Sequence, residues 1–222
     1  MDALQTIEAE TGPNPTATIL ILHGLGADGN DFVPIAQELD LSAIGAVRYV
    51  LPHAPVRPVT INGGYQMRAW YDIRGTEQQG LEDEAGLRAS VAAVEVLLAR
   101  ERERGIAAKR IVLAGFSQGC AMALLTGVRH AERLAGIAGL SGYLPLAGRT
   151  AQERSPANAD TPIFLAHGGH DDIVVPERGH ASFLQLKELG YPVEWHDYPM
   201  GHSVCMEEIA DLNEWLLQVL AA

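Results

Sequence analysis

The sequence predicts an α/β protein in which helices cover both faces of a mostly parallel sheet. Several short apolar runs have the length of strands, and some are apolar throughout, as in strands buried on both faces. Stretches with helical periodicity separate these runs, and such alternation is typical of parallel sheets. No linker-like tract or internal repeat divides the chain, so residues 1–222 are expected to form a single domain.

The strands are expected at the short apolar runs, residues 18–22, 47–51, 111–114, 134–140, 163–166 and 193–196. The clearest helix presents one apolar face from Leu87 to Leu98 and stops at Gly105. The charged run 100–104 is expected to be a solvated helix end. Further helices are expected at residues 120–127, 176–189 and 204–220.

Two segments, residues 57–80 and 143–161, are too long and irregular to be ordinary connections. Segments of this kind usually cover a site rather than only join elements. Substrate contacts are therefore expected in both.

The chain is acidic, with a formal net charge of -12. Its field repels phosphate backbones and anionic membrane surfaces, so neither nucleic-acid binding nor membrane insertion is expected. The first residues show no basic stretch followed by an apolar one, and a cytoplasmic protein is therefore expected. Cys120 and Cys205 lie far apart without metal or redox spacing, and we expect them to be small buried hydrophobic residues.

The pentapeptide Gly-Phe-Ser-Gln-Gly at residues 115–119 joins a predicted strand to a predicted helix. This context is what a nucleophile elbow requires, because the serine at the tip of that sharp turn is strained. The residues two before and two after the serine must be small, and Gly115 and Gly119 meet this need. Ser117 is therefore the candidate nucleophile. Ser141 also follows a predicted strand, but it lacks such glycines and is expected to be a turn residue.

In open parallel sheets, ligands bind beyond the carboxyl ends of the strands, so residues that directly follow strands are the ones to search for chemistry. Four such loops carry, in chain order, a glycine-rich stretch, the candidate serine, two adjacent aspartates and a histidine. The order Ser, Asp, His is that of hydrolases built on a nucleophile elbow. It differs from the orders in the two best-known serine protease folds.

The chemistry needs a different group for each task. A serine hydroxyl is a weak nucleophile near pH 7, so an imidazole has to take its proton and return it to the leaving group; His202 is the candidate. A carboxylate behind that ring fixes its tautomer, and Asp171 is the candidate, with Asp172 as the alternative. The backbone N–H groups of Leu25 and Gln118 are at the places required to face the oxyanion of the intermediate.

Other histidines have simpler explanations. His23, at a strand end, is expected to be a hydrogen-bonded structural residue, and His196, within a strand, a packing or surface residue. One cluster could suggest a metal site, but it shows no zinc-type spacing, so no metal is expected. Its members are His167, His170, Asp171, Asp172 and His180.

Four motifs together resemble the phospholipase/carboxylesterase family of α/β hydrolases, which includes bacterial carboxylesterases and acyl-protein thioesterases. They are His-Gly-Leu-Gly-Ala-Asp at 23–28, the elbow at 115–119, the 57–64 loop with Trp-Tyr-Asp at 70–72, and Tyr-Pro-Met-Gly-His at 198–202. The resemblance spans nearly the whole chain and is closest to the bacterial carboxylesterases. One departure is Cys120, where the family more often has a second glycine; it is expected to tighten packing under the elbow.

The resemblance implies a compact esterase with the α/β-hydrolase fold, without a large cap domain and without a metal or cofactor. It assigns the family's triad and oxyanion hole to Ser117, Asp171, His202, Leu25 and Gln118. The family's His-Gly-x-x-Asp spacing from His167 selects Asp171 over Asp172. The resemblance also places Trp70 and Met67 near the acyl pocket, and it makes a homodimer possible by analogy.

The residues and the resemblance together predict a serine carboxylesterase that hydrolyses small to medium carboxylic esters through an acyl-enzyme intermediate. Its partner is then a small-molecule ester. An acyl-protein thioesterase or a lysophospholipase would use the same triad, which cannot choose among them. A non-catalytic scaffold on the same fold is disfavoured, because a scaffold does not need nucleophile, base, acid and donor loop together.

Overall fold

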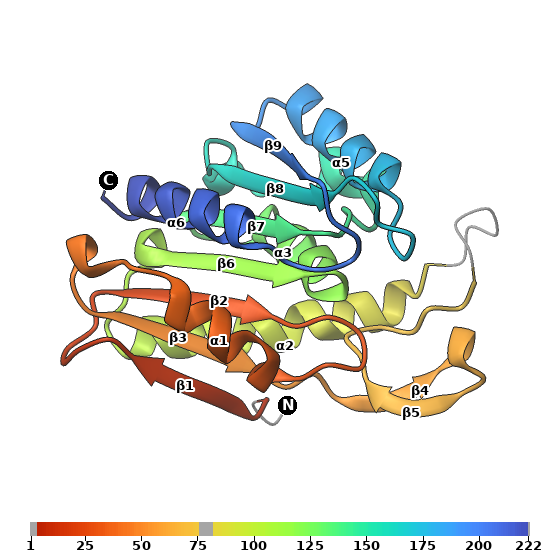
Figure 1. The fold of residues 1–222 in the computed structure, drawn as a ribbon, viewed down its shortest axis with the longest axis horizontal. Helices are drawn as coiled ribbons and strands as arrows, with labels where there is room; N and C mark the ends of the chain where they lie inside the picture. Colours follow the sequence, from red (N-terminus) through yellow and green to blue (C-terminus); the bar gives the residue numbers. More distant parts are fainter. Residues whose placement is uncertain (1–3, 76–81, 222) are drawn as a thin grey trace.

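A mostly parallel sheet forms the centre of the molecule (Figure 1). The computed structural model describes residues 4–75 and 82–221, and within these residues seven strands form the sheet in the order β1-β3-β2-β6-β7-β8-β9. Neighbouring strands run parallel, except that β1 and β3 are antiparallel. The strands are β1 (Thr6–Glu10), β2 (Ala17–Leu22), β3 (Val47–Pro52), β6 (Ile111–Phe116), β7 (Gly136–Leu140), β8 (Ile163–Gly168) and β9 (Val193–Tyr198).

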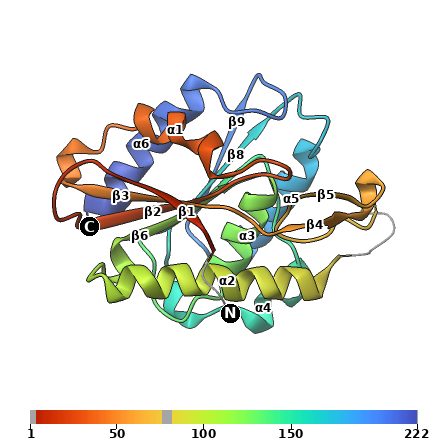
Figure 2. The ribbon, with the colours of Figure 1, turned by 90° about the horizontal axis from the view of Figure 1, so that it is seen from below.

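Helices cover both faces of this sheet (Figure 2). They are α1 (Val33–Glu38), α2 (Glu84–Glu103), α3 (Gln118–Gly127), α4 (Thr150–Glu153), α5 (Pro176–Glu188) and α6 (Met206–Ala221). None of the helices in the described ranges is long and apolar enough to cross a membrane.

Two apolar clusters form the core, one on each face of the sheet. The first contains residues of α2, α3 and α5, and the second contains residues of α1 and α6. Along β2, Leu20 and Leu22 belong to the first cluster and Ile19 and Ile21 to the second. This alternation arises because successive side chains of a strand point to opposite faces. It explains why β2, which is buried at every position, is apolar almost throughout.

The six predicted strands correspond to β2, β3, β6, β7, β8 and β9, and the predicted helices to α2, α3, α5 and α6. The helix α2 begins after Asp83, whose side chain accepts a hydrogen bond from the Gly86 N–H. It ends before Gly105, which has a φ of +92°, a conformation that glycine adopts without strain. The predicted stop at this glycine is confirmed.

The sequence does not predict β1, α1 or a two-stranded hairpin. The hairpin begins one residue before the segment 57–80, which was expected to be irregular, and its strands are β4 (Val56–Val59) and β5 (Tyr65–Arg68). Its turn contains Gly63 and Gly64, with φ of +65° and +79°. Pro58 and the charged Arg57 before it weaken the strand pattern, which explains the miss.

The other segment, residues 143–161, contains α4 and short 3-10 turns. Residues 76–80 of the first segment lie outside the described residues.

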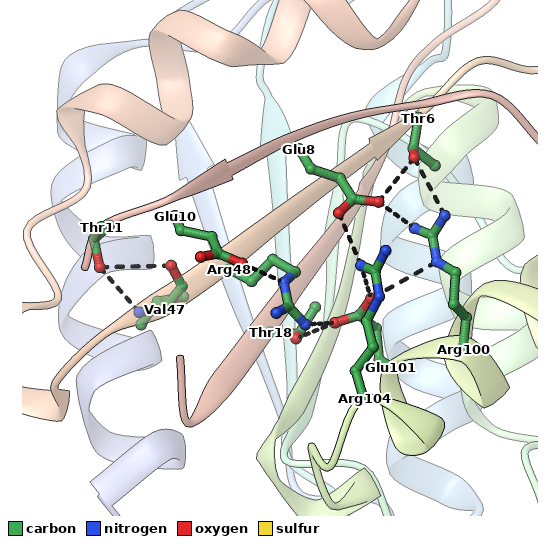
Figure 3. A network of polar contacts seen from close by, with 10 residues as sticks. All are labelled: Thr6, Glu8, Glu10, Thr11, Thr18, Val47, Arg48, Arg100, Glu101 and Arg104. Carbon is green, nitrogen blue, oxygen red and sulfur yellow. Dashed lines mark hydrogen bonds and ion pairs between the residues drawn. The ribbon is translucent and has the colours of Figure 1, made fainter. Parts of the chain in front are cut away.

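Glu101, near the end of α2, is the centre of a polar network beside the first residues of β2 and β3 (Figure 3). Its side chain is fully buried. Its carboxylate accepts hydrogen bonds from Thr18 at 2.8 Å, and from Arg48 and Arg104 at 2.9 Å each. Arg48 also pairs with Glu10 of the antiparallel edge strand at 2.9 Å.

The run 100–104 is therefore more than a solvated helix end. The expectation is wrong for Glu101, which turns toward the sheet, whereas Glu103 is exposed. A buried carboxylate is tolerated there because three donors from the helix and two strands surround it. The network fastens α2 to the sheet.

We expect the substitution Glu101→Gln to lower the free energy of unfolding by about 3 kcal/mol, because it leaves Arg48 and Arg104 without the carboxylate they share. Denaturant unfolding followed by circular dichroism measures the effect. Glu103→Gln, on the same helix but exposed, is the matched control, with an expected change below about 0.5 kcal/mol. Equal stabilities for the two variants would contradict the assignment.

Candidate active site

Ser117 stands at the junction of β6 and α3 in a strained conformation, with φ of 56° and ψ of -117°. Small residues on both sides make this turn possible. A Cβ on Gly115 would lie 2.2 Å from the backbone of Gly119, and a Cβ on Gly119 would lie 1.9 Å from the carbonyl oxygen of Leu22. The geometry is that of a nucleophile elbow.

Three side chains form a continuous hydrogen-bonded chain at the carboxyl edge of the sheet. His202 Nε2 lies 2.9 Å from Ser117 Oγ, and His202 Nδ1 lies 2.7 Å from Asp171 Oδ2. A carboxylate only accepts, so Nδ1 carries the hydrogen and Nε2 is left as the acceptor for the serine hydroxyl. The ring of Phe116 packs against the imidazole, with 4.8 Å between centroids.

Asp171 is held as an ionised carboxylate. Its Oδ1 accepts hydrogen bonds from the backbone N–H groups of Ile173 and Val174, each at 2.9 Å. Burial would raise the pKa of Asp171, but the hydrogen bonds from His202 and from these two amides outweigh it, so the pKa lies below its ordinary value. Asp172, the alternative left by the sequence, is exposed, and the contact with His202 comes from Asp171.

The other histidines lie in different settings. His23 is fully buried, donates from Nδ1 to the carbonyl oxygen of Gly24 and accepts from the N–H of Ala54 at Nε2. Burial lowers the pKa of His23, which favours the neutral ring in this structural role. His196 stacks on Phe164 within the sheet, as expected for a packing residue. Among the described residues, no group of three or more potential ligands is arranged to hold a metal ion.

Leu25 and Gln118 line the same cavity as Ser117. Within the described part of the chain, neither N–H donates a hydrogen bond to a protein acceptor. A Cβ on Gly24, between β2 and Leu25, would lie 3.3 Å from the Cβ of Ser117, so this loop is in contact with the elbow. Both amides are therefore free to bind a negative oxygen beside the serine.

The side chain of Gln118 ties the elbow to a covering loop. Its Oε1 accepts from the N–H of Trp70, and its Nε2 donates to the carbonyl oxygen of Tyr71, both at 2.9 Å. Trp70 is itself fully buried, and its indole N–H donates to the carbonyl oxygen of His23 at 2.8 Å. The loop that contains Trp70 is thus fixed to the two backbones that carry the candidate donors.

A cavity of about 1550 Å³ opens over Ser117. Both segments predicted to cover a site contribute to it, through residues such as Ile73 and Tyr143. The sequence analysis missed two further contributors, Phe32 and Ile35, because it did not predict the short helix α1. Ile35 lies in α1, and Phe32 directly precedes it.

Trp70 and Met67, proposed from the resemblance to lie near the acyl pocket, are not among the residues that line this cavity. Trp70 is fully buried. Met67 is on β5, where its sulfur accepts a hydrogen bond from Asn62. Their substrate contact stays a prediction. Tyr71, the residue after Trp70, does line the cavity. Its hydroxyl group shares a hydrogen bond with the hydroxyl group of Tyr143 at 2.8 Å.

Cys120 packs under the elbow as expected. A Cβ on Gly139 would lie 2.7 Å from its sulfur and a Cβ on Gly142 2.5 Å from its Cβ, so the thiol fills space that these glycines leave. Burial, with a smaller contribution from the charge of Glu208, raises the pKa of Cys120. The buried thiol is therefore inert.

Glu208 is a fully buried carboxyl group in the first turn of α6, which follows the His202 loop. Neither of its oxygens has a hydrogen-bond partner within the described residues. Burial raises the pKa of Glu208 to about 8, so the folded protein holds this carboxyl group neutral near pH 7.

Comparison with known proteins shows the family of the chain. The family model described as phospholipase/carboxylesterase matches residues 4–220. The chain belongs to the phospholipase/carboxylesterase family. It is 40% identical over 207 residues to the acyl-protein thioesterase 1 of Yarrowia lipolytica, covering 90% of this chain and 91% of that protein. It is 41% identical over 239 residues to the acyl-protein thioesterase 1 of Mycosarcoma maydis, covering 100% of both chains.

Solved structures of similar fold include Arabidopsis thaliana SOBER1, with a TM-score of 0.87, 31% identity, and coverage of 92% of this chain and 99% of that chain. Zea mays acyl-protein thioesterase 2 follows with a TM-score of 0.85, 30% identity, and coverage of 97% and 99%. The α/β-hydrolase fold and the family expected from the sequence motifs are confirmed. This member of the family is a carboxylic ester hydrolase of the serine hydrolase type.

The neutral Glu208 predicts a dependence of stability on pH. Its pKa is 4.5 ordinarily and about 8 in the folded protein, so the unfolded chain releases a proton above pH 4.5 that the folded chain keeps. The stabilisation from this group is complete below pH 4.5 and is lost as the pH rises to 8.

We therefore expect Glu208→Gln, which cannot ionise, to gain stability over the unsubstituted protein across that range, by up to about 1.4 kcal/mol per pH unit. Denaturant unfolding at a series of pH values measures the difference. Glu207→Gln, at the exposed neighbouring position, should show no such trend. Parallel curves for Glu208→Gln and the unsubstituted protein would contradict the prediction.

Proposed function

We propose that the protein hydrolyses carboxylic esters in two acyl-transfer steps carried by Ser117, His202 and Asp171. The observation that supports this most directly is the unbroken hydrogen-bonded chain from the serine hydroxyl to the carboxylate, at 2.9 Å and 2.7 Å. The serine end of that chain faces a cavity large enough for an ester. Leu25 and Gln118 line the same cavity, and neither backbone N–H donates to an acceptor among the described residues.

In the first step, the oxygen of Ser117 attacks the ester carbonyl carbon while its proton passes to Nε2 of His202. The ring then carries a positive charge, which the ionised carboxylate of Asp171 stabilises across Nδ1. A neutral acid at position 171 would not provide this stabilisation. The depressed pKa of Asp171 therefore suits its role.

The carbonyl oxygen becomes negative in the tetrahedral intermediate, and the N–H groups of Leu25 and Gln118 donate to it. Because both amides are fixed by backbone packing, they need no rearrangement when the charge develops. The intermediate collapses as His202 gives its proton to the departing alcohol. Water then attacks the acyl-serine with the same histidine as base, and the acid and free Ser117 are released.

For the substrate, we propose small to medium carboxylic esters with small-molecule alcohols. Apolar groups from several elements line the cavity, among them Phe32, Ile35 and Leu87. These side chains suit an acyl chain or an apolar alcohol rather than a charged polymer. The net charge of -12 is consistent with a substrate that is not polyanionic.

A second candidate is thioester hydrolysis on acylated protein. The relatives from Yarrowia lipolytica and Mycosarcoma maydis, at 40% and 41% identity, bear the name acyl-protein thioesterase 1. The reacting groups would be the same. Only the leaving group changes, from an alcohol to a thiol, which departs more readily because it is the stronger acid.

We expect Ser117→Ala to lower the turnover of a small aryl ester by about 10⁴-fold or more, because no other group can form the acyl-enzyme. Steady-state hydrolysis measures the loss, and circular dichroism checks that the fold is retained. A fluorophosphonate probe should label the unsubstituted protein and not the variant. Undiminished turnover in Ser117→Ala would refute the proposal.

For the acid, Asp171→Asn should lower kcat by about 10²- to 10⁴-fold, because the amide favours the wrong tautomer of the histidine. Asp172→Asn is the matched control at the exposed adjacent position, and it should retain nearly full activity. If only Asp172→Asn is crippled, the assignment of the acid is wrong.

The substrate is tested by a series of aryl esters of increasing acyl length beside an oxygen ester and a thioester with the same acyl group. We expect the highest kcat/KM for short to medium acyl groups, with the oxygen ester hydrolysed efficiently. Hydrolysis of the thioester alone would favour the second candidate instead.

A further inference from the structure

A second histidine, besides His202, lies close to the carboxylate of Asp171. His167 is the last residue but one of β8, and it is 1% exposed. Its Nε2 lies 2.7 Å from the carbonyl oxygen of Val174 and 3.4 Å from Asp171 Oδ2. The same Oδ2 accepts the hydrogen bond from His202. Two imidazoles therefore flank one carboxylate oxygen.

The tautomer of His167 follows from its partners. A carbonyl oxygen only accepts, so Nε2 carries the hydrogen that bonds to Val174. The other nitrogen, Nδ1, is buried with no hydrogen-bond partner among the described residues. It packs against Gly179 of α5, where a Cβ would lie 2.4 Å from it. Nε2 is thus the donor nitrogen of this ring.

The ring is also fixed in orientation. It stacks on Trp195 of β9, with 5.9 Å between ring centroids and an interplanar angle of 20°. Gly179 packs against its Nδ1, and its Nε2–H group donates to the carbonyl oxygen of Val174. Because β8 has a neighbouring strand on each side, a side chain held in this way on β8 is a rigid reference for the loop beyond the strand.

Val174 connects the His167 ring to the carboxylate of Asp171. Val174 donates its N–H to Asp171 Oδ1 and accepts the hydrogen bond of His167 at its carbonyl oxygen. Ile173 supplies the second amide for Oδ1. Because Oδ1 is held by the loop and the loop is held by His167, Oδ2 is kept facing His202.

We propose that His167 is a positioning residue for the reaction, which fixes the turn around Val174 so that Asp171 stays hydrogen-bonded to His202. This inference rests on the proposed function of those two residues. A purely structural role explains the site less well. An apolar side chain would fill the same space without a buried nitrogen that lacks a partner, so the Nε2–H group is the feature that histidine adds.

Other titratable groups near His167 belong to a separate cavity of about 310 Å³. Those on α5 are Glu177 and His180, and the one on β9 is Asp197, whose carboxylate accepts from the indole N–H of Trp195 at 3.0 Å. None of the three lines the cavity that contains Ser117. They stay unchanged in the variants below, so a change in the pH profile can be assigned to the Asp171 and His202 pair.

Three substitutions separate positioning from packing. His167→Leu removes the donor and fills the space. His167→Gln keeps a donor, because the glutamine amide nitrogen reaches about the position of Nε2. His167→Asn has the same amide but is one methylene shorter and reaches only the position of Nδ1. The readouts are kcat and KM for a small aryl ester, the pH profile of kcat/KM, and the melting temperature.

We expect His167→Leu to melt close to the unsubstituted protein while its kcat falls roughly 10- to 100-fold with little change in KM, because the carboxylate is no longer held in line. The acidic limb of its pH profile should move to lower pH, since a displaced carboxylate makes the histidine base easier to deprotonate. His167→Gln should restore most of kcat and the original profile, and His167→Asn should not. If the leucine variant does not fold, the glutamine and asparagine variants carry the same comparison.

Full activity in the leucine or the asparagine variant would overturn the inference, as would equal impairment of the glutamine and asparagine variants. These results are distinguishable from failure of the proposed function. If Ser117→Ala is inactive and the His167 variants are unaffected, only the positioning role is wrong. If Ser117→Ala keeps its activity, the proposed function is wrong and the inference fails with it.

Discussion

The active site depends on the close approach of two backbones, the elbow after β6 and the end of β2. The distance of 1.9 Å between a hypothetical Cβ on Gly119 and the oxygen of Leu22 leaves no room for any side chain. This contact holds Ser117 at a φ of 56°. It also brings the N–H of Gln118 beside the loop that carries Leu25, so nucleophile and donors share one rigid frame. Backbone packing, which does not relax as side chains do, sets their geometry.

The acid and the base reach this frame from the two loops that follow β8 and β9. Because those strands are parallel neighbours, their carboxyl ends lie side by side, and Asp171 and His202 meet although 31 residues separate them. The loops themselves are irregular, so their side chains need local fixation. Asp171 obtains it from two backbone amides. The hydrogen bond from His202 and these two amides outweigh burial and lower the pKa of Asp171, which keeps the carboxylate available to balance a positive imidazole.

The sequence predicts the parts of the site whose geometry is local. An elbow needs small residues at fixed distances from its serine, and buried strands need apolar runs, so Ser117 and its strand can be identified without the fold. Contacts between distant segments cannot be read in this way. β1 pairs with β3 through a half-exposed sequence of weak strand character. Trp70 is an aromatic residue of the kind that often lines pockets. Its indole N–H instead donates to the buried carbonyl oxygen of His23.

The two ends of β2 serve different purposes, and this separation explains how the fold accommodates a strained turn. At its first residues, Thr18 binds the buried carboxylate of Glu101, which also holds two arginines. At the other end of β2, the carbonyl oxygen of Leu22 packs against Gly119 of the elbow. The apolar stretch between them is buried on both faces and resists displacement in either direction. Strain at Ser117 can therefore persist, because β2, against which the elbow packs, is anchored at its other end by the hydrogen bond between Thr18 and Glu101.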